Sequence, residues 1–243
     1  MQKMSKKTFV YLTGHSKGIG KNICESLFQQ DENIFIHGIS RTEKWKHERL
    51  KTTLMDLSHP DKFNTGIFEK HNDASKIVLV NNAGMLGDMN RVGSLSSDSI
   101  QKTVMLNFTS ALLLTNDFLK FYKDHPAQKL IVNVSTGVTN YPIDGWSLYC
   151  STKAGLEMFC RVIDKELELD NRKDVKLFSI APGKIDTDMQ GEIRKADPKG
   201  FSMVNDFISY KEKGELVSAE ETGKRFADLI LKPDSRKKLI DHF

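Results

Sequence analysis

Tyr149 and Lys153 are the two residues whose types and spacing point most directly to a reaction. They lie four positions apart at the start of a stretch with helical periodicity, so their side chains would share one face of a helix. A tyrosine hydroxyl has an ordinary pKa near ~10 and is a poor acid at neutral pH. A lysine ammonium about 4 Å away would favour the phenolate by up to ~4 kcal/mol at an effective dielectric of about 20, or roughly three pKa units. The pair therefore predicts a general acid that protonates a reacting oxygen.

A glycine-rich segment at residues 13–20, TGHSKGIG, lies between a short apolar run and a helical pattern. Gly14, Gly18 and Gly20 allow the backbone to turn sharply, to approach a pyrophosphate and to start a helix whose N–H groups point at the anion. In this strand–loop–helix context the segment predicts a dinucleotide-binding loop. Its expected cofactor contacts are the three glycines together with Ser16, Lys17 and Ile19.

The residues after the second apolar run indicate which dinucleotide binds. An NAD site needs an acidic side chain about 20 positions beyond the glycines to bind the ribose 2′-hydroxyl. Ser40 and Arg41 occupy that place, and no carboxylate occurs before Glu43. Arg41 carries a planar guanidinium suited to a phosphate, and Lys17 adds a second cation from the glycine loop. Two cations attract a 2′-phosphate that a carboxylate would repel, so the sequence favours NADPH/NADP+ over NADH.

Short β-rich apolar runs alternate with longer amphipathic stretches, a pattern typical of a parallel sheet covered by helices. The helix that begins near Tyr149 has the clearest apolar stripe, from Leu156 to Leu167. No linker or internal repeat divides the 243 residues, which a single core can accommodate. We expect an α/β fold with a Rossmann-type doubly wound parallel sheet, three layers and a single domain over residues 1–243. The expected strands are residues 9–12, 34–38, 53–55, 77–80, 130–134, 175–180 and 239–241.

Residues 183–216 differ from the rest of the chain. They are polar, contain Pro198 and Gly200, and show no sustained strand or helix pattern. An insertion after a late strand of an open α/β sheet lies over the carboxyl edge, where ligands bind. We therefore expect a substrate lid at residues 183–216, with an ordinary surface excursion as the alternative.

The composition excludes several other functions. Hydrophobic residues make up 39% and charged residues 28%, and the formal net charge of +4 is spread without a basic stripe, so nucleic acid is not an expected partner. Cys24, Cys150 and Cys160 have neither metal-ligand spacing nor a disulfide framework. The apolar run at residues 9–12 is too short for a signal peptide or a membrane span. We expect a cytoplasmic protein with reduced thiols, no metal and no membrane partner.

Further motifs stand in a characteristic order. The chain carries NNAG at residues 81–84, Asn107 within a helical pattern, VNVST at 132–136, YCSTK at 149–153, and PG at 182–183 followed by Thr187. Together with the glycine loop, these motifs resemble those of the short-chain dehydrogenase/reductase family over nearly the whole chain. The resemblance implies that Tyr149 protonates a carbonyl oxygen and that Lys153 holds the nicotinamide ribose. It also implies that Asn107 anchors a water that feeds the proton relay.

The same resemblance implies further cofactor contacts. Asp56 and Leu57 match the family's adenine contact, and Asn82 matches the segment under the cofactor ribose. Ile185 and Thr187 match the loop over the nicotinamide amide. The remaining expected cofactor contacts are Ala83, Gly84, Tyr149, Lys153, Pro182 and Gly183.

The family's catalytic serine usually stands thirteen residues before the tyrosine, where this chain has Thr136. Ser135 precedes it by one position and would point to the opposite face of a strand. Thr136 retains a hydroxyl donor and adds a methyl group. We expect Thr136 to take the role of the serine, with Ser135 as the alternative.

Within the family, the chain resembles the sepiapterin reductases and the bacterial benzil reductases in NNAGM at 81–85, GWSLYC at 145–150 and APGKIDTDMQ at 181–190. This resemblance implies NADPH-dependent reduction of a ketone beside a second carbonyl, in a pterin side chain or an aromatic 1,2-diketone. Trp146, Gly183 and Asp241 would then contact the substrate, Asp241 as a pterin anchor. The alternatives are a core wall for Trp146 and a polar strand end for Asp241.

Two other functions compete with this one. The first is reduction of another carbonyl, such as a 3-oxoacyl thioester or a sugar. The second is a sensor or scaffold that binds NADP(H) without turnover; such proteins commonly lose the tyrosine or lysine, and this chain keeps both. Because family members associate through the helix that carries the tyrosine, we expect a homodimer or homotetramer.

Overall fold

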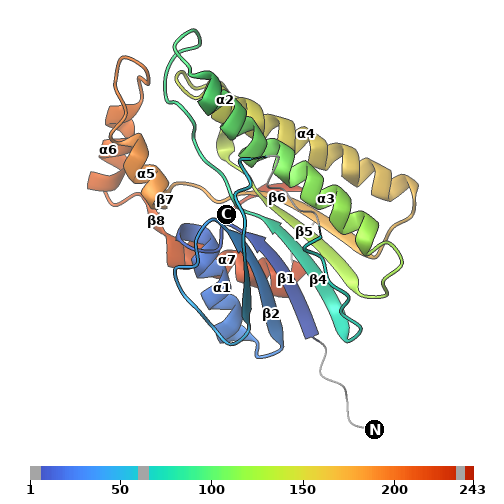
Figure 1. The fold of residues 1–243 in the computed structure, drawn as a ribbon. Coiled ribbons are helices and arrows are strands. Elements are labelled where there is room, and N and C mark those ends of the chain that lie inside the picture. Colours follow the sequence, from blue (N-terminus) through green and yellow to red (C-terminus); the bar gives the residue numbers. More distant parts are fainter. Residues whose placement is uncertain (1–6, 60–65, 234–238) are drawn as a thin grey trace.

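The computed structural model describes residues 7–59, 66–233 and 239–243, and a seven-stranded parallel sheet forms its centre (Figure 1). The strand order is β3-β2-β1-β4-β5-β6-β9, so the direction of winding reverses between β1 and β4. The strands are β1 Lys7–Thr13, β2 Ile34–Ser40, β3 Leu50–Leu54, β4 Ala74–Asn81, β5 Gln128–Val134, β6 Val175–Ala181 and β9 Ile240–His242.

Helices cover both faces of this sheet (Figure 1). α1 (Gly18–Gln30) and α7 (Ala219–Leu231) pack on one face. α3 (Ser110–Phe121) and α4 (Ser147–Leu169) pack on the other, and α2 (Ser97–Val104) leads into α3. The predicted three-layer, doubly wound fold of a single domain is confirmed.

The central strands are apolar because both of their faces are buried. Successive side chains alternate between the two hydrophobic cores: Val78 and Val80 of β4 face α1 and α7, whereas Ile77 and Leu79 face α3 and α4. Burying each such side chain contributes about 1.5–3 kcal/mol relative to exposure. Since all the strands are parallel, their carboxyl ends meet at one edge, and the loops after β1, β4, β5 and β6 carry the predicted site residues.

All seven predicted strands are present, but the position of β3 was predicted incorrectly. The apolar pattern indicated residues 53–55, whereas β3 spans Leu50–Leu54. β3 is an edge strand that pairs with β2, and none of its residues is fully buried. Its side chains therefore lack the hydrophobic pattern by which a strand is recognised.

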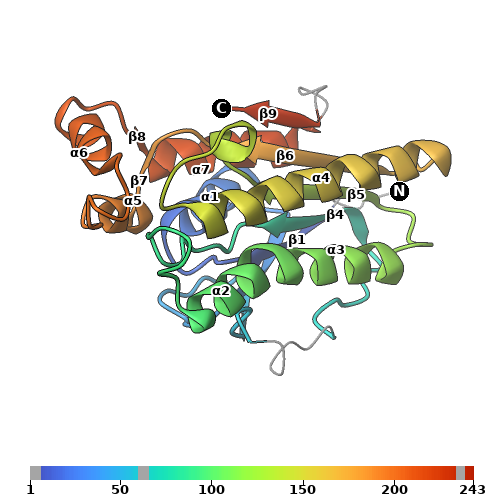
Figure 2. The same cartoon turned by 90° about the horizontal axis from the view of Figure 1, so that it is seen from above.

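Residues 183–216, whose sequence shows no sustained strand or helix pattern, nevertheless contain regular elements. They form α5 (Asp188–Ile193) and α6 (Val204–Glu212), and β7 (Ile185–Asp186) pairs with β8 (Val217–Ser218). Both helices are short, so neither contains enough turns for a helical period to be distinguished. They project beyond the carboxyl ends of the sheet strands (Figure 2).

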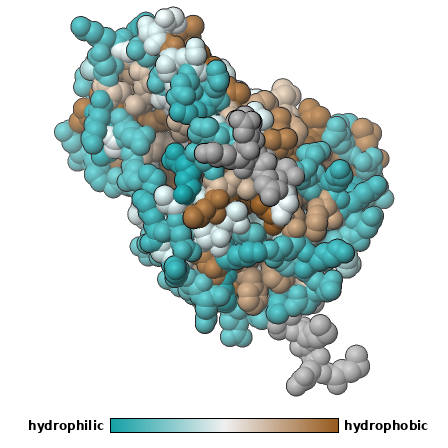
Figure 3. Space-filling view, in the orientation of Figure 1, coloured by the Kyte–Doolittle hydropathy of each residue, from teal (hydrophilic) through white to brown (hydrophobic). Residues whose placement is uncertain are grey.

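The segment with α5 and α6, here called the arm (residues 187–213), forms a lobe beside the main body (Figure 3). A third hydrophobic cluster joins the two parts. It includes Ile193, Phe201 and Val204 from the arm, and Trp146 and Tyr149 from α4 and its N-terminal end. The arm is thus anchored at the start of the helix that carries the predicted proton donor. In the described part of the chain, no helix is both long enough and apolar enough to cross a bilayer.

Candidate active site

Tyr149 lies in the first turn of α4, with its side chain almost fully buried at 9% exposure. Thr136, which follows β5, lies close enough for its hydroxyl to act on the pKa of Tyr149. Burial raises the pKa of Tyr149 to about 12, although the Thr136 hydroxyl opposes the shift. Tyr149 therefore carries its proton throughout the neutral range.

Lys153 follows one turn later on the same face of α4, also buried. Its Nζ lies 5.9 Å from the centroid of the Tyr149 ring and donates to the backbone carbonyl of Val134 at 2.7 Å. Burial lowers the pKa of Lys153 to about 8. The carbonyl at the end of β5 thus fixes the position of the ammonium group.

The expected effect of Lys153 on Tyr149 is not present. The spacing of the two residues predicted a tyrosine pKa lowered by the lysine, whereas the structure shows a pKa raised by burial. The ammonium group bonds to Val134 and lies 5.9 Å from the centroid of the tyrosine ring. Desolvation of the phenolate consequently outweighs the attraction of the lysine.

Asn107 lies in a π-helical turn, Met105–Thr109, between α2 and α3. Its side chain accepts from the Met85 N–H at 2.8 Å and donates to the Met85 carbonyl at 2.8 Å and the Thr152 hydroxyl at 3.2 Å. A Cβ at Gly84 would lie 3.4 Å from Asn107 Oδ1 and 3.8 Å from Lys153 Nζ. The structure therefore brings Asn107, Gly84 and Lys153 together, and π-helical turns occur frequently at functional sites.

The glycine loop connects β1 to α1 as predicted. Gly14 and Gly18 have φ angles of +71° and +56°, which favour glycine, and a Cβ at Gly20 would come within 2.3 Å of the Gly14 carbonyl oxygen. Asn82 steadies the loop, because its side-chain amide donates to the carbonyls of Thr13 and Gly14. Lys17, the residue before α1, forms no side-chain cap for the helix. The first N–H groups of α1 therefore face the loop without a side-chain acceptor from the N-cap, an arrangement suited to an anion.

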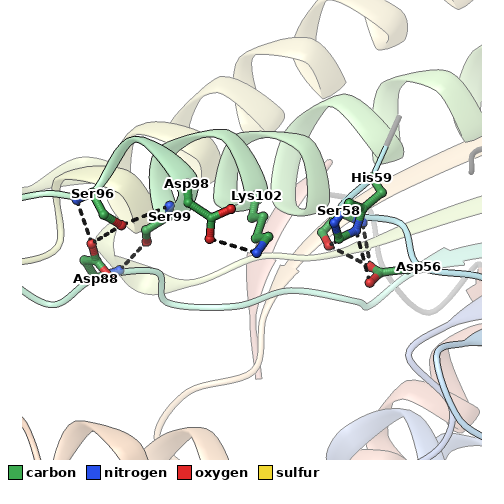
Figure 4. A network of polar contacts seen from close by, with 8 residues as sticks. All are labelled: Asp56, Ser58, His59, Asp88, Ser96, Asp98, Ser99 and Lys102. Atoms are coloured by element: carbon green, nitrogen blue, oxygen red, sulfur yellow. Dashed lines mark hydrogen bonds and ion pairs between the residues drawn. The ribbon is translucent and has the colours of Figure 1, made fainter. Parts of the chain in front are cut away.

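The residues after β2 and β3 lie at the same edge. The Ser40 hydroxyl donates to the Thr42 carbonyl at 2.7 Å, and the Arg41 side chain is exposed. Asp56 accepts from the backbone and hydroxyl of Ser58, and His59 lies 3.2 Å away (Figure 4). Burial acts to raise the pKa of Asp56, but the Ser58 hydrogen bonds and the charges of His59 and Arg41 hold it below its usual range. The next residue, Leu57, is buried in the core on the α3 side.

The loop after β6 reaches the glycine loop. Pro182 and Ile185 are buried, whereas Gly183 is exposed with a φ of +84°. The methyl group of Thr187 lies 4.0 Å from the position of a Cβ at Gly18. The start of the arm therefore lies over the proposed phosphate site.

Ser135 and Thr136 differ in their surroundings. The Ser135 N–H donates to the Ile180 carbonyl at 2.8 Å, and its buried hydroxyl has no hydrogen-bond partner among the described residues. Thr136 is partly exposed, and its hydroxyl acts on the pKa of Tyr149. This geometry supports the predicted choice of Thr136.

Trp146 forms part of the wall beside Tyr149. It stacks on Phe201 with a centroid distance of 5.1 Å and contacts Tyr149 edge-on at 5.4 Å. Asp241 lies elsewhere: on β9 it pairs with Ile180, a residue of the core under α1 and α7, whereas Tyr149 belongs to the helix on the opposite face. Because partners in parallel strands point to the same face, the structure does not bring Asp241 next to Tyr149.

The comparisons with known proteins agree with this geometry. A family model described as short chain dehydrogenase matches residues 8–198, which is more than half of the chain. The chain belongs to the short-chain dehydrogenase family. The resemblance inferred from the motifs is thus confirmed.

This short-chain dehydrogenase has well-covered relatives. Benzil reductase ((S)-benzoin forming) from Bacillus subtilis (strain 168) is 34% identical over 236 residues, covering 95% of this chain and 96% of the relative. Sepiapterin reductase from Xenopus tropicalis is 31% identical over 244 residues, covering 90% and 89%. A crystal structure of a Saccharomyces cerevisiae short-chain dehydrogenase/reductase has a TM-score of 0.80 at 26% identity, covering 97% and 95%. This short-chain dehydrogenase is therefore an oxidoreductase that acts on CH–OH or C=O groups.

Two supporting residues of this short-chain dehydrogenase were not predicted from the sequence. The Thr13 hydroxyl accepts from the N–H groups of Asn82 and Ala83 at 2.9 and 3.0 Å, tying the glycine loop to the end of β4. Thr152 bonds to Asn107 and so links α4 to the π-helical turn. Both threonines stand inside the recognised motifs, but their partners come from distant parts of the chain. Spacing alone does not reveal those partners.

Proposed function

We propose that this enzyme is an NADPH-dependent carbonyl reductase in which Tyr149 donates the proton to the substrate oxygen. The observation that carries the proposal is the buried Tyr149 at the carboxyl edge of the sheet, where the Thr136 hydroxyl acts on its pKa. The glycine loop opens at the same edge, and the Lys153 ammonium is held against the tyrosine ring. A binding protein without turnover would not need this arrangement.

The described residues fit a nicotinamide dinucleotide. The positive φ angles at Gly14 and Gly18 form a loop that a bulkier residue would strain, and the N-terminus of α1 lies behind it. A Cβ at Gly183 would meet no atom within 4 Å among the described residues, so the backbone there can be approached closely. When bound, the cofactor supplies the hydride that reduces the carbonyl.

The chain's own groups orient and protonate the substrate. The hydroxyls of Thr136 and Tyr149 donate hydrogen bonds to the carbonyl oxygen, where negative charge develops, and the tyrosine proton then moves to that oxygen. The ammonium of Lys153, whose pKa is about 8, is mostly charged at neutral pH and would hold the nicotinamide ribose beside Tyr149. Asn107 holds the Met85 backbone and Thr152 in place beside this path.

We further propose that the substrate is a vicinal dicarbonyl or a ketone in a pterin side chain. The names of the Bacillus subtilis and Xenopus relatives support this substrate class. The aromatic wall of Trp146, Phe201 and Phe207 is buried except at Phe207, whose partly exposed ring would suit a flat aromatic substrate. The arm packed on that wall would act as the substrate lid predicted at residues 183–216.

The preference for NADPH rests on two cations at the adenosine end. Arg41 is exposed, and its charge contributes to the lowered pKa of Asp56, the expected adenine contact. Lys17 lies in the glycine loop with 53% of its side chain exposed. Both cations are accessible to a 2′-phosphate, and NADH lacks that group.

A panel of substrates tests the proposed function. Purified enzyme is mixed with NADPH and, in parallel, NADH, and cofactor oxidation is followed by absorbance with benzil, sepiapterin, a simple aldehyde and a 3-oxoacyl thioester. We expect fast turnover of benzil or sepiapterin and a clear preference for NADPH. Greater kcat/KM with the thioester or the aldehyde would overturn the substrate class, and equal rates with NADH would overturn the cofactor assignment.

A further inference from the structure

Lys17 of the glycine loop forms an ion pair with a residue 171 positions away. Its Nζ lies 2.8 Å from Oδ2 of Asp188, the first residue of α5, and the two side chains are 53% and 71% exposed. Thr187, immediately before, lies over Gly18. At the start of the arm, the Asp188 carboxylate is thus paired with Lys17, the cation that the proposed 2′-phosphate site requires.

The local charges favour an ionised carboxylate at this position. The Lys17 ammonium, followed by the charge of Lys44, holds the pKa of Asp188 below its usual range, so the side chain is anionic at neutral pH. Lys44 belongs to the loop after β2 that also carries Arg41. Asp188 is therefore within electrostatic reach of both Lys17 and Lys44. An exposed ion pair of this kind is weak and exchanges readily with another anion.

We propose that Asp188 is a specificity-determining residue that competes with the cofactor 2′-phosphate for Lys17. This inference rests on the proposed use of NADPH. While Lys17 bonds to Asp188, the ammonium is neutralised for a phosphate, and the carboxylate also repels that phosphate directly. Asp188 consequently weakens the binding of NADP(H) but has little effect on the binding of NADH. It therefore limits the preference for NADPH over NADH.

The lid offers a matched control variant. Asp186 lies two positions earlier and is also exposed, but it pairs with Lys211 of α6 rather than with the glycine loop. Asp188→Asn and Asp186→Asn remove the same charge from the same segment. A difference between these two variants therefore isolates the contact with Lys17.

The dissociation constants of NADPH, NADH and adenosine 2′,5′-bisphosphate are measured by fluorescence titration and calorimetry. We expect Asp188→Asn to tighten NADPH and the bisphosphate by about two- to fivefold, the range of an exposed ion pair. NADH should bind unchanged, and Asp186→Asn should leave the dissociation constants of all three ligands nearly unchanged. The tightening should vanish in a Lys17→Ala background and shrink near 1 M salt, where the Debye length falls to about 3 Å.

Three results would overturn the inference: weaker NADPH binding in Asp188→Asn, equal tightening of NADH, or the same effect from Asp186→Asn. The first would mean that Asp188 positions Lys17 for the phosphate. A wild-type enzyme without NADPH preference would instead contradict the proposed function. In that case the dissociation constant of adenosine 2′,5′-bisphosphate would still test the role of Asp188, because this ligand carries the 2′-phosphate without the nicotinamide.

Discussion

Thr136, just after β5, and Tyr149, in the first turn of α4, place two hydroxyl donors near each other. Donors aimed at a developing oxyanion commonly account for about 10²–10³ in turnover each. Ser135, in contrast, is bonded through its backbone to β6 and buries its hydroxyl. The two neighbours both carry a hydroxyl, but their surroundings differ, and this difference favours Thr136 as the catalytic donor.

We predict that Thr136→Ala lowers kcat by about 10²–10³-fold. Ser135→Ala should change kcat much less, because its hydroxyl does not reach Tyr149. Steady-state kinetics with benzil and NADPH compare the two variants, and circular dichroism confirms that both fold. A larger loss in Ser135→Ala would show that the serine, not the threonine, contacts the substrate.

The buried Lys153 predicts an alkaline limit to activity. Its pKa of about 8 means that the ammonium loses its proton as the pH rises through that value, whereas Tyr149, with a pKa of about 12, stays protonated. We expect kcat/KM to fall above about pH 8 and the fall to move to higher pH in Lys153→Arg, which keeps its charge. A pH–rate profile of the free enzyme measures this limit. A wild-type profile that stays flat to pH 10 would contradict it.

The lowered pKa of Lys153 also makes the free energy of unfolding depend on pH. Between about pH 8 and the ordinary lysine pKa near ~10.4, the unfolded chain binds the proton of Lys153 more tightly than the folded enzyme does. The contribution of this residue to the free energy of unfolding therefore increases as the pH rises through that window. Tyr149 acts in the opposite direction above about pH 10, since its folded pKa is raised.

At the level of elements, the sequence predicted those whose signal is local. The strand–glycine–helix unit and the long stripe of α4 follow from side-chain period and glycine placement. The π-helical turn around Asn107 was not predicted, because nothing in its own residues departs from an ordinary helix. α5 and α6 were missed since their stability comes from packing on Trp146 rather than from their own periodicity.

Phe201 anchors the arm, and its truncation should loosen that element alone. It is fully buried and stacks on Trp146. Phe201→Ala should lower the stability of the arm by about 3–5 kcal/mol, because the packing of the ring is lost. We expect amide exchange in α5 and α6 to increase by about 100-fold or more, with little change in β4 and β5. The KM for benzil should rise while the NADPH dissociation constant stays the same.

Phe118→Ala provides the contrast. Phe118 is equally buried, but it lies in the core between the sheet and α3. Its truncation should lower the melting temperature and increase exchange throughout the sheet. If Phe201→Ala behaved in the same way, the arm would be an integral part of the main core and not a separable lid.

At the scale of the whole molecule, the alternation of strands and helices predicted the central sheet, and the exposed edge strand β3 was placed too far along the chain because it lacks a hydrophobic pattern. The pKa of Tyr149 and the partners of Lys17 could not be predicted, because both depend on contacts between distant segments.

The outer face of α4 shows a further property of the whole molecule. Met158, Val162 and Leu169 are 59%, 47% and 73% exposed on it, although all three are hydrophobic.

These exposed residues lie on the helix through which a homodimer or homotetramer is expected. We predict that the double variant Met158→Lys, Val162→Lys lowers the molar mass measured by light scattering. Two buried charges at such an interface would cost far more than the apolar contacts they replace. Val92→Lys, at a hydrophobic position 78% exposed in the loop before α2, should leave the mass unchanged. A monomeric wild-type enzyme would contradict the prediction.

The measurement that tests the central claim most directly is kcat for benzil reduction by NADPH in the wild type and in Tyr149→Phe. Phenylalanine keeps the edge-on contact with Trp146 and removes only the hydroxyl. We predict that kcat falls by about 10²–10⁴-fold, the range of general acid catalysis, while the dissociation constant of NADPH is unchanged. A variant that keeps most of its kcat would show that another group supplies the proton and that Tyr149 is not the acid of this reductase.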